Sequence, residues 1–563
     1  MKLLGICVLA AISLSLGFSP KSPDSTLLVA MHSELKRSMD SLRLKDNPGP
    51  YFLSYWLLDI QGYDVEASQG AIEKAAPTPL RFIDVDLRVG SYVHDQSLYE
   101  GGLVGGSGLR APVPESDDTL LLRQAFWAET DARYKVALEQ LAQKQSFLAA
   151  HHGMDALPDW SRQKVLQQRD IDSIQPPDTA AWIELCRKLS ALLAKNTWMA
   201  ESRVAYQYYY ITFYYVDSEG STYIQSLQEN TLLAALLCQA QDGAPLWDYL
   251  RMAARAGLPG GGHTGATSYE ALRDSLAGIV QRLDELRHSK PLEFYRGPVL
   301  FSGPAAGEVI QHALLDPQMQ LRQALSENSE QPFLLDLQGR KYLPDNFTVR
   351  DTPGLGNYQG QALFGSYHFD HQGQPAEEVT LVDKGRLTDF YRGKLPLQIS
   401  SQHDNGHWRY GGGFPGVVQV EAPVGVPEGA LLDSLRTRTD EEGAPFGLRV
   451  SKFLDDDAVK LLRHPLAQSI SYGSFAASRG SFSLPAPVEM DAVDNKTGKA
   501  TPVRGVFFNM VDSKSLRDIA AVGDTPHLLE PQASFSILCP SLLFSLLDLG
   551  GSHEAQPKLP LLP

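Results

Sequence analysis

Cysteine is scarce in this sequence, which has only four among 563 residues: Cys7, Cys186, Cys238 and Cys539. Small secreted domains that depend on disulfides carry cysteines at much higher density. Removal of an N-terminal leader would remove Cys7 and leave an odd number of cysteines. The sequence therefore implies no disulfide framework, and a chain of this length can bury a core large enough to fold without one.

Positive charge and long apolar runs are also limited. There are 50 Lys and Arg residues against 66 Asp and Glu residues, which gives a formal net charge of -16. Nucleic-acid binding needs a basic surface to neutralise phosphates, and no Lys/Arg cluster occurs here. A membrane-spanning helix needs a run of about 18 or more apolar residues, and the interior of the chain has none. We therefore expect no nucleic-acid partner, and no integral membrane segment after removal of any N-terminal signal.

Two signatures of nucleotide binding and acyl transfer are missing. The glycine-rich segment at residues 101–108 lacks the Gly-Lys-Ser/Thr ending of a phosphate-binding loop. The chain also has no Gly-x-Ser-x-Gly nucleophile elbow. The sequence does not exclude a cysteine nucleophile, because such residues need no local motif.

The N-terminus has the pattern of a secretory signal. Lys2 precedes an apolar stretch at residues 3–17, which is long enough for a signal peptide and too short to span a membrane. Small residues around Ser15 to Ser19 could supply a cleavage site. We therefore expect residues 1–19 to be a signal peptide and the protein to be exported, either periplasmic or extracellular. The alternative is a buried N-terminal helix, because a single lysine makes a weak positive region.

Residues 20–288 are predicted to form an N-terminal α/β domain. Strand-like alternation covers residues 51–70 and 80–92, and the second of these places Asp84 and Asp86 on one face. A dense run of tyrosines and β-branched residues at 204–215 is followed by a turn at 217–220 and a further strand at 221–226. The tyrosines could form a peptide-facing surface. A half-buried strand pair is favoured because tyrosine prefers strands intrinsically.

Helices are predicted between these strands and after them. Helical periodicity covers residues 117–150, with Ser116 as the expected N-cap, and residues 179–195. Another helix begins after Ser268 and ends before Pro291, where proline forbids continuation. We place the domain boundary there. Residues 292–551 should form a strand-rich C-terminal domain, and residues 552–563 a flexible tail.

The segment at residues 297–312 combines a short apolar strand, a tight turn and a helix opened by Pro304. It resembles the hallmark of the TldD/PmbA family, which includes zinc metallopeptidases once called modulators of DNA gyrase. In active members a helix at this place carries His-Glu-x-x-x-His. This chain keeps the glutamate as Glu308 and the second histidine as His312, but has Gly307 in place of the first histidine.

Further segments resemble the same family in the same order along the chain. They are residues 365–390, the Gly-His-x-Arg loop at 405–409, the closing strand at 540–551 and, less distinctively, residues 81–92. Together they cover roughly the second half of the sequence, which is far more specific than one short motif. The resemblance implies an α+β fold with two domains, an N-terminal α/β domain and a C-terminal β-rich domain.

The resemblance also implies Glu308 as a catalytic carboxylate and His312 as a zinc ligand. A zinc peptidase needs three protein ligands and an open position for water. Residues five apart on an α-helix point about 140° apart, so the family's histidine pair requires local distortion or long reach. Here Gly307 offers no donor atom. The family's third ligand is a cysteine upstream of the closing strand, and residues 526–535 contain none.

We therefore expect the zinc site to be lost, with no cofactor unless the family's site is retained in modified form. Cys539 lies in an apolar setting that suits a buried, inert thiol. Glu308 and His312 are four residues apart and share a helix face, so the alternative reading is an ordinary polar pair. Residues implied at the substrate cleft are Gly307, Asp370, Gly373, His407 and Arg409.

Two loop clusters could hold a metal only with help from distant residues. They are His403, Asp404 and His407 in one loop, and His368, Asp370 and His371 in another. We predict an exported, metallopeptidase-related protein that handles unfolded peptides or protein segments without its own zinc site. The alternative is a non-catalytic peptide-binding subunit that pairs with an intact metallopeptidase paralogue. A homodimer or a heteromer with such a paralogue is the expected assembly.

Overall fold

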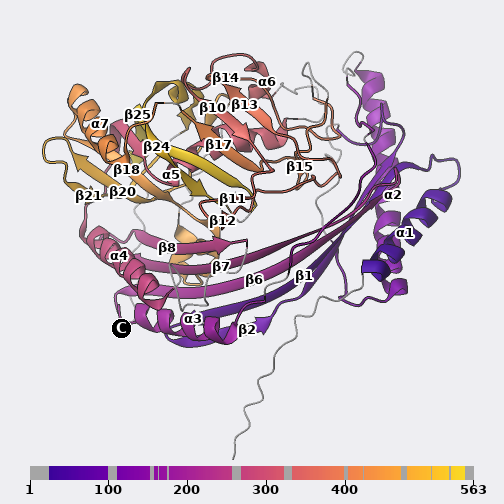
Figure 1. Ribbon diagram of the computed structural model, residues 1–563, viewed down its shortest axis with the longest axis horizontal. Coiled ribbons are helices and arrows are strands. Elements are labelled where there is room, and N and C mark those ends of the chain that lie inside the picture. The colour runs from indigo at the N-terminus through magenta and orange to yellow at the C-terminus, as the bar shows by residue number, and fades with distance from the viewer. Residues whose placement is uncertain are drawn as a thin grey trace, which may run out of the picture.

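The computed structural model describes residues 24–98, 111–151, 157–162, 164–173, 176–255, 268–321, 332–397, 403–422, 424–470, 479–508, 510–531 and 534–551. The signal peptide expected at residues 1–19 and the tail expected at 552–563 lie outside these residues, as does the glycine-rich segment at 101–108. Two large sheets with helices packed on them confirm the α+β, two-domain class (Figure 1).

The first sheet has eight strands in the order β4-β3-β1-β6-β7-β5, with β2 paired to β1 and β8 paired to β7. Its strands are β1 (Pro50–Ser68), β2 (Ala71–Pro77), β3 (Leu80–Val89), β4 (Ala111–Pro112), β5 (Gln167–Asp170), β6 (Met199–Asp217), β7 (Thr222–Gln239) and β8 (Pro245–Ala254). Neighbours are antiparallel except β5 and β7. The long strands β1, β6 and β7 form a curved layer below the second domain (Figure 1).

Strand alternation gives this sheet two different faces. Alternate residues of β1, such as Tyr55 and Val65, are buried in cores shared with the helices. Those helices are α1 (Asp24–Ser41), α2 (Thr119–Ala150), α3 (Thr179–Leu193) and α4 (Tyr269–His288). Intervening residues such as Trp56 point to the opposite face because successive side chains of a strand alternate. That second face looks toward the C-terminal domain (Figure 1).

The second sheet has eleven strands in the order β14-β13-β10-β17-β25-β9-β18-β20-β21, with β22 and β24 also paired to β25. Its strands are β9 (Phe294–Phe301), β10 (Thr348–Asp351), β13 (Val379–Asp383), β14 (Arg386–Leu387), β17 (Val417–Glu421), β18 (Phe446–Phe453), β20 (Pro487–Asp494), β21 (Ala500–Pro502), β22 (Val506–Phe508), β24 (Ile519–Leu529) and β25 (Ser536–Gly551). Short two-stranded pairs are β11 (Asn357–Tyr358) with β12 (Gln361–Ala362), β15 (Trp408–Arg409) with β16 (Gly412–Gly413), and β19 (Ser481–Phe482) with β23 (Val511–Asp512).

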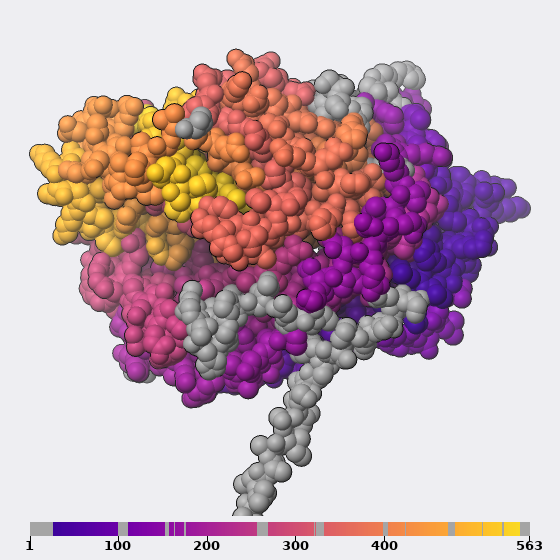
Figure 2. Space-filling model, in the orientation of Figure 1, coloured from indigo at the N-terminus to yellow at the C-terminus, as the bar shows by residue number. Residues whose placement is uncertain are grey.

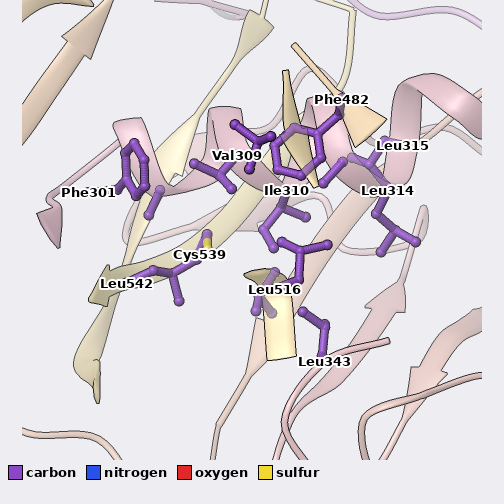
Figure 3. Close-up of a cluster of buried hydrophobic side chains, with 14 of the residues drawn as sticks. Phe301, Val309, Ile310, Leu314, Leu315, Leu343, Phe482, Leu516, Cys539 and Leu542 are labelled. Atoms are coloured by element: carbon purple, nitrogen blue, oxygen red, sulfur yellow. The ribbon is translucent and has the colours of Figure 1, made fainter. Parts of the chain in front are cut away.

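Helical segments also lie in the second domain. They are α5 (Ala305–Ile310), η3 (Gln311–Leu315), η4 (Asp316–Gln320), α6 (Phe333–Asp336), α7 (Glu428–Glu441), α8 (Asp456–Leu461), η5 (Pro465–Ser469) and η6 (Ser513–Asp518). Among them, α8 and η5 pack against β7 and β8 of the first sheet. The α5 and η3 segments share a core with Phe301 and Leu542 (Figure 3). Leu431 of α7 packs with Leu300, the residue before Phe301, so the two helical layers contact opposite faces of β9.

Several local predictions are confirmed. Asp217 and Gly220 form the turn between β6 and β7. The hydroxyl of Ser268 accepts the backbone N–H of Ala271 and caps α4. The predicted cap of α2 was wrong, because Asp118 rather than Ser116 accepts the first free N–H groups of that helix. Among the described residues, no helix has the length and apolar character that crossing a membrane requires.

The two domains pack closely against each other, as the space-filling view shows (Figure 2). Ion pairs join β8 to the second domain: Arg251 contacts Asp455 at 3.0 Å, and Lys452 contacts Asp248 at 2.8 Å. Cys539 is buried as the fourth residue of β25, and its thiol forms no disulfide. Burial raises the pKa of this thiol well above its ordinary value, which makes it a poor nucleophile.

Candidate functional site

Glu308 and His312 lie on a helix that follows a central strand of the second sheet. Strand β9 ends at Phe301, and Gly303 turns the chain with a φ of 61°. Four apolar side chains of the helix are buried against the sheet (Figure 3): Val309, Ile310, Leu314 and Leu315. Their burial fixes the rotation of the helix, so Glu308 and His312 lie along its partly exposed side.

The winding of this helix changes beside His312. The α5 segment is a regular α-helix, whereas η3 is π-helical and is closed by the backbone N–H of Asp316, which donates to the carbonyl of Gln311. Single π-turns are frequent at functional sites because they change which side chains share a face. This π-helical turn begins at Gln311, so it includes His312 but not residue 307.

His312 lies between two carboxylates of its own helix. Its Nδ1 lies 2.7 Å from Asp316 Oδ2, and its Nε2 lies 3.7 Å from Glu308 Oε2. Burial lowers the pKa of His312, but hydrogen bonding to Asp316 and interaction with Glu308 outweigh it and raise this pKa to about 9. The imidazole is therefore protonated near neutral pH, so a metal would have to displace this proton in order to bind.

The polar side of this helix lies close to the first domain. Burial raises the pKa of the Tyr249 hydroxyl on β8, and the negative charges of Asp455 and Glu308 raise it further. That hydroxyl donates to the carbonyl of Phe453 at 2.9 Å. Glu308 and His312 therefore belong to the contact region between the domains.

The surroundings of Gly307 do not fit a zinc site. A Cβ at this position would lie 3.0 Å from Leu529 Cδ2 and 3.1 Å from Leu529 Cβ. An aliphatic side chain thus occupies the place toward which a residue at 307 would point, and Leu529 has no donor atom for a metal. Across the described residues, no group of three or more His, Cys, Asp and Glu residues is arranged to hold a metal ion. His312 alone supplies a recognisable ligand, whereas zinc requires three or four.

Asp370 and Gly373 shape a turn in a loop of the second domain. The carboxylate of Asp370 is completely buried and accepts the backbone N–H groups of Gln372, Gln374 and Trp408. Burial raises the pKa of Asp370 to about 6 against the lowering effect of these hydrogen bonds. Gly373 has a φ of 77°, which favours glycine. Both residues thereby hold this loop against the loop that contains Trp408.

His407 and Arg409 are buried in the same region. His407 is completely buried, stacks on Tyr391 with ring centroids 4.7 Å apart, and places its Nε2 2.9 Å from the carbonyl oxygen of Glu377. Arg409 donates to the carbonyl of Pro415 and packs its guanidinium over aromatic rings. These contacts give both residues a structural role. His403, by contrast, is exposed and pairs with the carboxylate of Glu377, and the described residues around it form no group of three or more potential metal ligands.

A cavity of ≈300 Å³ lies between the first sheet and these two loops. It is lined by Phe52, Ser54, Trp56, Leu58, Asp84, Asp86, Trp160, Phe213, Tyr215, His371, Gln372, Trp408, Tyr410 and Gly411. Glu308 and His312 are not among the lining residues, but the helix that carries them ends nearby. A Cβ on Gly412, which follows the last lining residue, would lie 2.6 Å from the carbonyl oxygen of Met319 in η4.

Residues 295–422 match the family model of the PmbA/TldA metallopeptidase C-terminal domain. This segment is therefore similar to the C-terminal domain of the TldD/PmbA family. The matched segment includes the helix of Glu308 and both loops that border the cavity. No curated protein matches the sequence.

Solved structures with a similar fold cover nearly the whole chain. Two are described as candidate modulators of DNA gyrase. The one from Thermotoga maritima has 13% identity and a TM-score of 0.55, covering 89% of this chain and 96% of its own. The one from Bacteroides thetaiotaomicron has 14% identity and a TM-score of 0.58, covering 94% and 98%. TldE from Thermococcus kodakarensis has 13% identity and a TM-score of 0.56, covering 93% and 100%. At such identities the likeness shows the fold.

Sequence patterns identified the helix and the loops of this region, but they missed the cavity. Its lining residues come from β1, β3, β6, residue 160 and two loops, which are separated by hundreds of residues. The available signal was the alternation along β1, β3 and β6. This alternation placed aspartates and aromatic residues on particular strand faces, but it did not reveal that these faces meet the two loops of the second domain.

Proposed function

We propose that this protein, which is similar to the TldD/PmbA family, handles unfolded peptides and lacks zinc-dependent hydrolysis of its own. The observation that carries the proposal is the contact between residue 307 and Leu529. In the active family members that the sequence resembles, this residue is a zinc-binding histidine. Here a glycine packs against an aliphatic side chain, so the position is filled by apolar contacts.

The loss of the metal would remove the chemistry as well as the ligand. A bound zinc lowers the pKa of its water to about 7, and a carboxylate such as Glu308 then accepts the proton. Without a zinc-bound water, whose pKa the metal lowers, Glu308 has no water proton that it can readily accept. Its carboxylate instead interacts with the imidazolium of His312 at 3.7 Å. We infer that Glu308 and His312 now serve mainly as an ion pair near the domain interface.

Peptide handling is supported by the family match and by the position of the cavity. The matched domain is described as a metallopeptidase domain, and metallopeptidases act on peptide chains. Ligand sites prefer the boundaries between domains, where the cavity lies. Export is proposed from the apolar stretch at residues 3–17, and intact-mass analysis of the protein from its native host tests it.

Binding and cleavage of unfolded casein peptides test the proposal together. We expect the wild-type protein to bind the peptides without cleaving them, and a metal chelator to change neither result. The variant Glu308→Gln should behave like wild type, as should the control Glu421→Gln, which changes a partly exposed carboxylate on β17. Cleavage that both the chelator and Glu308→Gln abolish, while Glu421→Gln leaves it intact, would contradict the loss of zinc chemistry.

A second candidate is a non-catalytic subunit that pairs with an intact metallopeptidase paralogue. Two large apolar side chains on α2 favour a protein partner: Leu120 is 71% exposed and Trp127 is 45% exposed. They are seven residues apart, which is two helical turns, so they share one face. Light scattering of the mature protein alone and with the paralogue tests this candidate, with Trp127→Ser as the variant that should weaken association.

A further inference from the structure

The cavity between the domains has one wall built from neighbouring strands of the first sheet. Trp56 of β1 lies opposite Asp84 of β3 on one side and opposite Tyr215 of β6 on the other. The adjacent row on the same face places Ser54 opposite Asp86. The strand register therefore sets two carboxylates beside a continuous row of aromatic rings.

The other wall comes from the loops of the second domain. His371 contacts Trp56 with ring centroids 4.9 Å apart and accepts the backbone N–H of Tyr410 on its Nδ1 at 3.1 Å. Its ring is thus held in place by both domains. Trp408 and Tyr410 of the second loop complete this wall.

The lining is rich in aromatic rings and negative charge. Seven of its side chains are aromatic rings of Phe, Tyr or Trp: Phe52, Trp56, Trp160, Phe213, Tyr215, Trp408 and Tyr410. Asp84 and Asp86 are its acidic members, and the lining includes neither lysine nor arginine. Aromatic faces and carboxylates both attract cations, the first through the ring quadrupole and the second through charge.

Two arginines contact these aspartates, and each of them also binds a second carboxylate. Arg88 lies 3.2 Å from Asp86 and binds Asp95 at 2.8 Å. Arg133 lies 3.9 Å from Asp84, and its Nε binds Glu129 at 2.7 Å. Each guanidinium is thus shared between two carboxylates.

Rings in the lining already bind cations of the chain itself. The guanidinium of Arg88 lies 3.4 Å from the ring centroid of Trp160, and the ammonium of Lys394 lies 4.7 Å from that of Phe52. Over Trp56 and Trp408, by contrast, no cation is placed by any described residue. The indole N–H of Trp160 is buried, with the side chain 3% exposed, and has no hydrogen-bond acceptor among the described residues. A cation that enters the cavity could therefore lie beside the rings of Trp56 and Trp408.

We propose that this cavity holds the cationic side chain of a peptide, lysine or arginine, between Trp56 and Trp408 and beside Asp84 and Asp86. The proposal rests on the proposed function, because it assumes that a peptide enters the space between the domains. A volume of ≈300 Å³ is at the small end of ligand cavities, which suits one long side chain better than a folded segment.

Two matched peptides test the proposal on the mature wild-type protein. Each is a short, unstructured Gly/Ser peptide with an acetylated N-terminus and one central residue, lysine in the first and acetyl-lysine in the second. The pair differs in charge but hardly in length. We expect the lysine peptide to bind about tenfold more tightly by calorimetry, the size of effect that cation–π contact with partial desolvation produces.

Variants locate the effect in the cavity. Asp84→Asn and Trp56→Leu should each remove most of the preference for lysine. The control Asp383→Asn changes an exposed aspartate of β13 and should leave the preference intact. Circular dichroism verifies that each variant is folded. The comparison of the two peptides on wild-type protein needs no variant at all, so it decides the matter even where a variant fails to fold.

The outcomes separate this proposal from the proposed function. Equal affinity for both peptides would overturn the cation site while peptide binding stands. If neither peptide binds, both proposals fall. A lysine-free peptide with an unblocked N-terminus that binds as tightly as the lysine peptide would assign the cavity to a terminal ammonium group and overturn the side-chain proposal.

Discussion

Replacing Gly307 with histidine should destabilise the protein, because the space that the new side chain needs is filled. Its Cβ alone would approach Leu529 Cδ2 to 3.0 Å and Leu529 Cβ to 3.1 Å, which is closer than most such contacts, so Leu529 would have to move. Leu529 is paired with Ile537 in the β24–β25 ladder, so its Cβ moves only if the strand moves.

The magnitude follows from two opposing effects. Overpacking of a well-packed region costs about 1–3 kcal/mol. Replacing a helical glycine by an ordinary residue returns about 0.5 kcal/mol. The free energy of unfolding of Gly307→His should therefore fall by about 0.5–2.5 kcal/mol relative to wild type. The variant should still bind zinc weakly, because Leu529 supplies no ligand.

Urea unfolding followed by tryptophan fluorescence measures this change. Gly278→His is the matched control, because Gly278 is also helical and a Cβ there meets nothing within 4 Å. The control should be as stable as wild type or slightly more stable. If Gly307→His were as stable as this control, the region would have room for a ligand and the reasoning would fail. Adding Leu529→Cys to Gly307→His should give tighter zinc binding than either single change.

Three further predictions concern titration and processing. His312 should titrate near pH 9 in an NMR titration of labelled imidazoles. Because its folded pKa lies above the ordinary 6.5, the stability that His312 contributes is complete below pH 6.5 and is lost as the pH rises through 9. A pKa at or below 6.5 would refute the ion pair. Burial raises the pKa of Glu229 to about 7. The free energy of unfolding of the wild type should therefore fall by up to about 3 kcal/mol between pH 4.5 and 7, and Glu229→Gln should not show this fall. Parallel pH profiles of the two proteins would contradict this prediction. The mature chain should begin between Gly17 and Asp24, and a cytosolic protein that retains Met1 would exclude export.

Much of the local fold could be predicted because its signals lie close together in the sequence. Alternation along residues 80–89 predicts the two faces of β3, with Asp84 and Asp86 opposite its buried residues. The turn at 217–220 and the cap at Ser268 follow from turn and cap chemistry alone. The cap of α2 was misplaced because Ser116 and Asp118 both suit that role, and only the backbone geometry selects Asp118.

The rest depends on contacts between distant residues, which no local pattern carries. Trp56 meets Tyr215 only through the β1–β6 register, and it meets His371 only because the domains dock. The π-helical turn at Gln311–Leu315 has no signature in its own residues. The sequence alone shows that Gly307 has no donor atom for a metal. It does not show that Leu529 fills the space beside Gly307.

The zinc content of the purified, mature wild-type protein tests the central claim most directly. The protein should be saturated with zinc, dialysed against metal-free buffer and measured by elemental analysis, with Gly307→His plus Leu529→Cys as the zinc-binding comparison. We expect far less than one zinc per wild-type chain. One zinc per chain, lost when His312 is replaced by glutamine, would show that the protein has a zinc site whose ligands include neither Gly307 nor Leu529.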